Sequence, residues 1–219
     1  MGLFQRKKTE EPATKEEEIK AYGWNAITEA FEKRYPEQTN PLHYGTLISW
    51  QLGGNDPLEG ISAYDAGEYY HFVSYGLSDL YEKESEDPEY SGYGFEFTLK
   101  LRKHGLTNEE AEIRGICGIL QALARMTFEH GEIFQPYEYI YTGQKEGMDA
   151  EAISAITGFI TALDELGTID TPNGKVTFVQ LIGMQDKELK TILDKRYQVR
   201  DLLAMLPDTL TDYTRKSIL

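Results

Sequence analysis

The chain has 219 residues, of which 40% are hydrophobic and 27% are charged, and its formal net charge is -15. This length and apolar content suit one domain with a buried core, and no run of about 18 apolar residues predicts a membrane-spanning helix. Phosphate contacts require bases, so the acidic balance disfavours direct nucleic-acid binding. The acidity either speeds encounter with a basic protein partner or only maintains solubility.

Two further features of the sequence indicate the cellular compartment. Cys117 is the only cysteine, which excludes an internal disulfide and fits a reducing environment. The basic residues near the N-terminus are followed by no apolar segment, so no signal peptide is predicted. We therefore expect a cytoplasmic protein.

The N-terminal part predicts a tail and a helix. Residues 1–14 mix opposite charges with little hydrophobic periodicity and are predicted to form a disordered lead-in, followed by one domain over 15–219. Thr14 and Glu17 match a capping box. The apolar residues after them recur at helical spacing, which predicts a helix that ends near Arg34.

Strand patterns dominate the next segment. The β-branched and aromatic stretch 43–52 predicts one strand, and 61–81 predicts two or three more. The polar stretch 82–89 predicts an exposed loop. Residues 94–103 alternate apolar and polar side chains, which predicts a strand with one buried face and with Glu96 on its solvent face.

A long amphipathic helix is predicted in the middle of the chain. Thr107 and Glu110 match a second capping box, and the apolar residues after them keep helical spacing to about Gly131. The apolar stretch 133–141 predicts a strand.

The last third predicts a hairpin and two helices. Residues 149–166 fit a helix or a strand, but the Asn-Gly pair at 173–174 predicts a type I′ hairpin turn, which favours an extended 157–170. Helices are predicted at about 186–193 and 197–206. The order of elements predicts an α+β domain in which helices flank a mixed sheet.

Five segments together resemble the suppressor-of-fused family over about residues 23–215. They keep the family's order and similar intervals: NPL and LGGNDPL at 40–42 and 52–58, HFVSYGLSDLY at 71–81, SGYGFEFTLKL at 91–101, LAR at 123–125, and TPNGKVTF at 171–178. The resemblance implies an α/β fold and a role in binding other proteins without catalysis. Animal members hold zinc-finger transcription factors inactive and carry an additional C-terminal domain. Stand-alone bacterial members resemble immunity proteins, or antitoxins, which neutralise a toxin.

The resemblance also implies one functional position. In animal members a partner peptide lies beyond the LAR helix, where an acidic side chain matters, and counting from that motif places Glu138 there. Met126 departs from the tyrosine of the animal relatives. We therefore expect this chain to use the same surface as the animal relatives but to bind a different ligand there.

The segment 64–97 has the most unusual composition, with seven tyrosines and nine carboxylates against Lys83 as the one base. Tyrosine is frequent at the centres of protein interfaces. Alternatively, half of these tyrosines belong to the core, the acids line a solvated loop, and Asp79 has a structural role in a turn. The candidate partner-binding residues are Tyr70, Tyr75, Asp79, Tyr81, Tyr93, Glu96 and Glu138.

Catalytic patterns are weak in this sequence. The four histidines lack metal-ligand spacing, and Ser78, His71 and Asp79 occur without a nucleophile elbow. His71 fits a hydrogen-bonded core residue better, and Cys117 fits an inert one. We expect that the protein is not an enzyme and binds no cofactor and no metal.

The predicted function is that of an immunity protein, a monomer or weak dimer, that binds a basic toxin such as a nuclease. The alternative is a regulatory scaffold.

Overall fold

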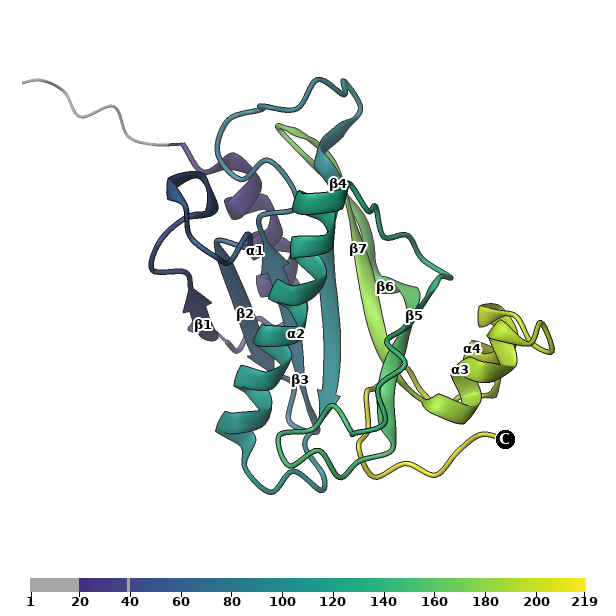
Figure 1. Ribbon diagram of the computed structural model, residues 1–219. Coiled ribbons are helices and arrows are strands. Elements are labelled where there is room, and N and C mark those ends of the chain that lie inside the picture. Colours follow the sequence, from purple (N-terminus) through teal and green to yellow (C-terminus); the bar gives the residue numbers. More distant parts are fainter. Residues whose placement is uncertain (1–19, 39) are drawn as a thin grey trace, which may run out of the picture.

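The computed structural model describes residues 20–38 and 40–219, which form one sheet with helices on both faces (Figure 1). The predicted lead-in and the capping box at Thr14 and Glu17 lie outside the described residues. The helices are α1 (Tyr22–Arg34), α2 (Glu109–His130), α3 (Asp186–Leu193) and α4 (Val199–Met205). The strands are β1 (Leu42–Gly45), β2 (Gly60–Asp65), β3 (Tyr69–Tyr75), β4 (Tyr90–Arg102), β5 (Tyr139–Tyr141), β6 (Ile156–Thr171) and β7 (Gly174–Gln185).

The seven strands form one mixed sheet in the order β1-β2-β3-β4-β7-β6-β5. Neighbouring strands are antiparallel except β4 and β7, which run parallel at the centre. A parallel pair needs a long connection, and here the connection contains α2, β5 and β6. The predicted α+β class with a mixed sheet is confirmed.

The two faces of the sheet are covered by different helices. Because successive strand residues point to opposite faces, Val179 and Leu181 of β7 join the core under α2, whereas Phe178 packs with Phe31 of α1. Ile182 packs with α3 and α4 on the same face as Phe178. The central strands are therefore buried on both sides.

The predictions for the first half of the chain are partly confirmed. The helix does end at Arg34, and 61–81 contains the two strands β2 and β3. The strand predicted over 43–52 is too long. It pairs with β2 only at Leu42–Gly45, and a 3-10 turn follows at Trp50–Leu52. Beyond Gly45, Leu47 and Ile48 are exposed to solvent and Trp50 lines a hollow, so these residues do not extend the ladder.

Helix α2 begins one residue later than its capping box predicts. The N-cap is Asn108, whose side-chain oxygen accepts a hydrogen bond from the Ala111 amide at 3.1 Å, so Thr107 is not the cap. The helix ends at His130, and its C-cap Gly131 has a φ of 73°. The strand predicted at 133–141 pairs only at β5, because the preceding residues form an irregular connection.

The hairpin between β6 and β7 is confirmed, and it settles the ambiguous stretch 149–166. This stretch is irregular up to residue 155 and extended from Ile156 onwards. Thr171 pairs with Gly174, so the two turn residues are Pro172 and Asn173. The turn is not type I′, because neither has a positive φ.

The C-terminal helices occur where the sequence predicts them, at α3 and α4. Within the part of the chain that the structure describes, every helix is too short or too polar to cross a membrane.

Candidate functional site

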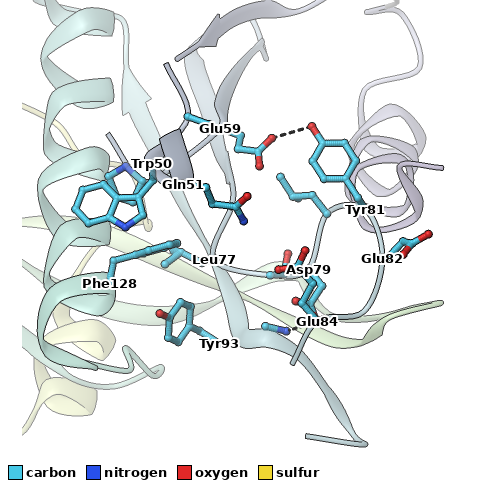
Figure 2. A pocket seen from close by; sticks show the side chains of 16 residues that line it. Trp50, Gln51, Glu59, Leu77, Asp79, Tyr81, Glu82, Glu84, Tyr93 and Phe128 are labelled. Atoms are coloured by element: carbon cyan, nitrogen blue, oxygen red, sulfur yellow. Dashed lines mark hydrogen bonds between the residues drawn. The ribbon is translucent and has the colours of Figure 1, made fainter. Parts of the chain in front are cut away.

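A cavity of about 190 Å³ lies where the loop after β3, the start of β4, the 3-10 turn and the C-terminal part of α2 meet (Figure 2). We call it the acidic hollow. Its floor contains Pro57 and residues 76–78. Its walls carry four aromatic side chains and four carboxylates: Trp50, Tyr81, Tyr93 and Phe128, and Glu59, Asp79, Glu82 and Glu84.

The floor of the acidic hollow is held by a buried carboxylate. Glu96 has no exposed surface. One of its carboxylate oxygens accepts hydrogen bonds from the amides of Gly76, Leu77 and Ser78 at 2.9 to 3.1 Å and from the Ser78 hydroxyl at 2.7 Å. The other accepts from the Ser74 hydroxyl at 2.5 Å. This carboxylate therefore determines the course of the loop that forms the floor.

The expectation that Glu96 faces solvent is wrong. Its strand does alternate polar and apolar side chains, but helices cover both faces of the sheet, so Glu96, Thr98 and Lys100 are all buried. Burial raises the pKa of Glu96 to about 7, against the opposing effect of the hydroxyl and amide donors around it. Glu96 is thus a positioning residue beneath the hollow.

Asp79 connects the wall of the acidic hollow to β4. Its carboxylate accepts hydrogen bonds from the Ser85 hydroxyl at 2.6 Å and from the Gly92 amide at 2.9 Å. On the other side of the same segment, the Asn173 side-chain amide donates to the backbone oxygens of Asp79 and Tyr81 at 2.8 and 3.0 Å. The hairpin tip and the acidic loop, distant in sequence, are therefore joined here.

The aromatic wall has a defined geometry. Phe128 of α2 makes edge contacts with Trp50 and Tyr93, with ring centroids 5.7 and 5.3 Å apart. Across the hollow, the Tyr81 hydroxyl donates to Glu59 at 2.7 Å (Figure 2). That hydrogen bond to a carboxylate raises the pKa of Tyr81 to about 12. Tyr81 and Tyr93 are both more than one-third exposed.

Tyr93 lies in an irregular segment at the start of β4. The register with β7 shifts between Tyr90 and Phe95. Gly92 has a φ of 57°, and a Cβ atom there would lie 2.8 Å from the Leu77 oxygen. This position therefore requires glycine for both its backbone conformation and its close approach to the floor loop.

Two of the candidate tyrosines are core residues. Tyr75 is 1% exposed and stacks on Trp24 with ring centroids 4.4 Å apart. Tyr70 is 8% exposed, and its hydroxyl donates to Glu109 at 2.7 Å. Their side chains stabilise the fold and offer little surface to a partner.

Glu138 lies at a different place, near a second hollow of about 480 Å³ between β4, β7 and residues 133–136. Glu138 is exposed, and its carboxylate accepts a hydrogen bond at 2.9 Å from the amide of Gln135, which lines this hollow. Gly92 and Tyr93 line both hollows. The structure thus brings Asp79, Tyr81 and Tyr93 together, whereas Glu138 contacts Gln135 of an adjoining hollow and does not line the acidic hollow.

Three residues of the acidic hollow were missed by sequence reasoning: Trp50, Glu59 and Phe128. They come from three separate elements, and no spacing along the chain relates them to Tyr81. The Gly-Gly-Asn-Asp-Pro stretch at 53–57, which the sequence predicts as a loop, directly follows the 3-10 turn Trp50–Leu52, and Gly53 there has a φ of 86°.

His71 is the hydrogen-bonded core residue that the sequence favours. Its two ring nitrogens lie 2.8 Å from the Tyr35 hydroxyl and 3.0 Å from Asp164. Burial lowers the pKa of His71. Although burial opposes it, the hydrogen bond with His71 lowers the pKa of Asp164 to about 2. Ser78 instead bonds Glu96, so the imagined Ser-His-Asp set does not assemble.

The described residues contain no group of three or more His, Cys, Asp or Glu side chains that could hold a metal ion. Cys117 of α2 is partly buried against the core, and burial raises the pKa of its thiol to about 12. The thiol is therefore a poor nucleophile at neutral pH.

The fold and site define a class: an α+β domain with an acidic, aromatic hollow at one end of its central strands. The family described as Suppressor of fused protein (SUFU) matches residues 54–216, and the chain belongs to this family.

The chain is also similar in sequence and in structure to individual suppressor-of-fused proteins. The chain is 29% identical over 201 residues to the Suppressor of fused homologs of Homo sapiens and Mus musculus. The match covers 84% of this chain but only 40% of each relative. A chain of the Sufu-Fu complex crystal structure superposes with a TM-score of 0.78 at 31% identity, covering 90% of this chain and 92% of that one. Drosophila Suppressor of Fused superposes with a TM-score of 0.76 at 30% identity, covering 90% of this chain and 51% of that one.

Proposed function

We propose that this chain is a non-catalytic protein-binding domain that uses the face around the acidic hollow. Membership of the suppressor-of-fused family carries the proposal. A solved relative of the same fold is in a complex called Sufu-Fu, which supports protein binding as the shared activity. The exposed Tyr81 and Tyr93 beside carboxylates have the composition of an interface centre.

Within that function, we propose a cytoplasmic immunity protein of bacterial type, monomeric or weakly dimeric, that neutralises a basic toxin such as a nuclease. The net charge of -15 would speed its encounter with a positively charged partner. The carboxylates of the acidic hollow and Glu138 would lie against that partner.

The test is co-expression with the product of an adjacent toxin-like gene. We expect growth to be rescued and a complex to be recovered. The double variant Tyr81→Ala/Tyr93→Ala should lose rescue. The control Tyr22→Ala/Tyr197→Ala, which removes two equally exposed tyrosines elsewhere, should retain it. Absence of both rescue and complex with the unmodified chain would contradict the immunity role.

The second candidate is a regulatory scaffold that sequesters an endogenous protein. The Sufu-Fu complex of a relative favours it, because that relative assembles with a protein. Purification of the tagged chain from a host that lacks any toxin gene tests it. Stoichiometric recovery of one regulator, lost in Tyr81→Ala/Tyr93→Ala, would favour the scaffold over the immunity protein.

A further inference from the structure

The acidic hollow has a charge that the described part of the chain does not balance. Its lining residues include four carboxylates and no Lys, Arg or His. Asp79 is engaged by Ser85 and Gly92, but Glu59, Glu82 and Glu84 form no ion pair with any base in residues 20–38 and 40–219. The hollow therefore has negative charge that no base of the described residues neutralises by an ion pair.

Two bases in segments that border the hollow have partners of their own. Lys83, the one base of the acidic loop, donates to the backbone oxygens of Tyr90 and Asn173 at 2.7 and 2.8 Å and to the Ser85 hydroxyl at 3.1 Å. Arg125 of α2 pairs with Asp56 at 2.8 Å. A cation in the hollow must therefore come from outside these elements.

The walls of the acidic hollow suit a flat cation. Rings of Trp50, Phe128 and Tyr93 form one side, and Tyr81 with Glu59 forms the other (Figure 2). Cations bind over aromatic faces, and the planar guanidinium stacks on rings and pairs with carboxylates better than an ammonium does. Trp50 and Phe128, which are only partly buried, also offer apolar surface to an aliphatic stem.

The size of the acidic hollow limits its occupant. Its volume of about 190 Å³ is below the roughly 300 Å³ at which sites for drug-sized ligands begin. One long side chain fits these dimensions better than a small-molecule cofactor does.

We propose that the acidic hollow binds an arginine side chain of the protein partner. This inference rests on the proposed protein-binding function and names the chemistry that its site recognises. The guanidinium lies between the aromatic wall and the Glu59–Tyr81 pair, and Glu82 and Glu84 supply further negative charge at the rim. Because these carboxylates are near solvent, the binding weakens as salt is added.

A peptide titration followed by NMR tests the assignment. The probe is acetyl-Gly-Arg-Gly-amide, and the controls are the same peptide with citrulline, which is neutral and nearly the same shape, and with lysine. The chain has two tryptophans, so the indole N–H of Trp50 reports on the hollow, while that of Trp24, stacked on Tyr75, serves as the internal reference. We expect a saturable shift of the Trp50 resonance with the arginine peptide and at least fivefold weaker binding of either control.

Matched variants complete the test. Glu59→Gln/Glu82→Gln/Glu84→Gln should weaken the arginine peptide at least fivefold, whereas Glu32→Gln/Glu37→Gln/Glu110→Gln, with the same change of charge outside the hollow, should not. Equal binding of citrulline, equal binding of lysine, equal loss in both triple variants, or no shift at Trp50 would each overturn the assignment. If the peptide fails while the chain still rescues growth, the arginine site is wrong and the proposed function stands. If the peptide binds but no protein partner forms a complex, the proposed function fails instead.

Discussion

At the scale of single residues, the Glu96 carboxylate accepts five hydrogen bonds while it is fully removed from solvent. Three of the donors are consecutive backbone amides, an arrangement that favours an anion. Burial acts in the opposite direction and raises the pKa of Glu96 to about 7.

The first prediction concerns truncation. Glu96→Ala removes the shared acceptor of several buried donors, and each unsatisfied donor costs about 1–3 kcal/mol, so we expect the free energy of unfolding to fall by at least ~3 kcal/mol. Glu96→Gln keeps one acceptor oxygen for the amides of the floor loop and should lose roughly half as much. Urea denaturation measures both. An alanine variant as stable as the glutamine variant would contradict the anchoring role.

The second prediction concerns pH. A carboxyl whose pKa is higher in the folded than in the unfolded chain stabilises the fold below the unfolded value of 4.5, and that stabilisation is lost as the pH rises through about 7. A shift of this size corresponds to roughly 3 kcal/mol. The free energy of unfolding of the native chain should therefore fall by about that amount relative to Glu96→Gln between pH 4 and pH 8. Parallel pH profiles of the two proteins would exclude the raised pKa.

At the scale of elements, the β6–β7 hairpin tip stabilises the acidic loop through Asn173. Asn173→Ala deletes two hydrogen bonds to backbone oxygens, which should cost about 1–2 kcal/mol and speed amide exchange in residues 80–90. Asn55→Ala, in an exposed loop, is the control. Unchanged exchange in residues 80–90 would show that the loop is ordered without the hairpin.

At the scale of the whole molecule, the segment after α4 returns across the sheet. The Thr211 amide donates to the Lys100 oxygen of β4 at 2.7 Å. Arg215 then pairs with Glu188 of α3 at 2.5 Å, with both side chains nearly inaccessible. Although burial opposes it, the hydrogen bonds from Arg215 lower the pKa of Glu188.

Arg215→Ala leaves a buried carboxylate without its partner, so we expect a loss of about 3–5 kcal/mol in the free energy of unfolding. Arg196→Ala breaks an exposed pair with Asp194 and should change it by less than about 1 kcal/mol. Thermal unfolding of both variants measures the difference. Equal effects would mean that the C-terminal segment contributes no more than a surface ion pair.

Periodicity along the chain was enough to predict α2, the β6–β7 hairpin, α3, α4 and the α+β class, because these elements bury one regular face or turn at a marked site. The tyrosine and carboxylate composition of residues 64–97, together with the family segments, also indicated Asp79, Tyr81 and Tyr93 as candidates. The tertiary structure alone decided that Glu96 lies inside, because a polar alternation does not reveal that a helix covers the polar face. It also decided that Trp50, Glu59 and Phe128 join Tyr81 in one hollow. That meeting depends on packing between elements distant in sequence, which no local pattern records.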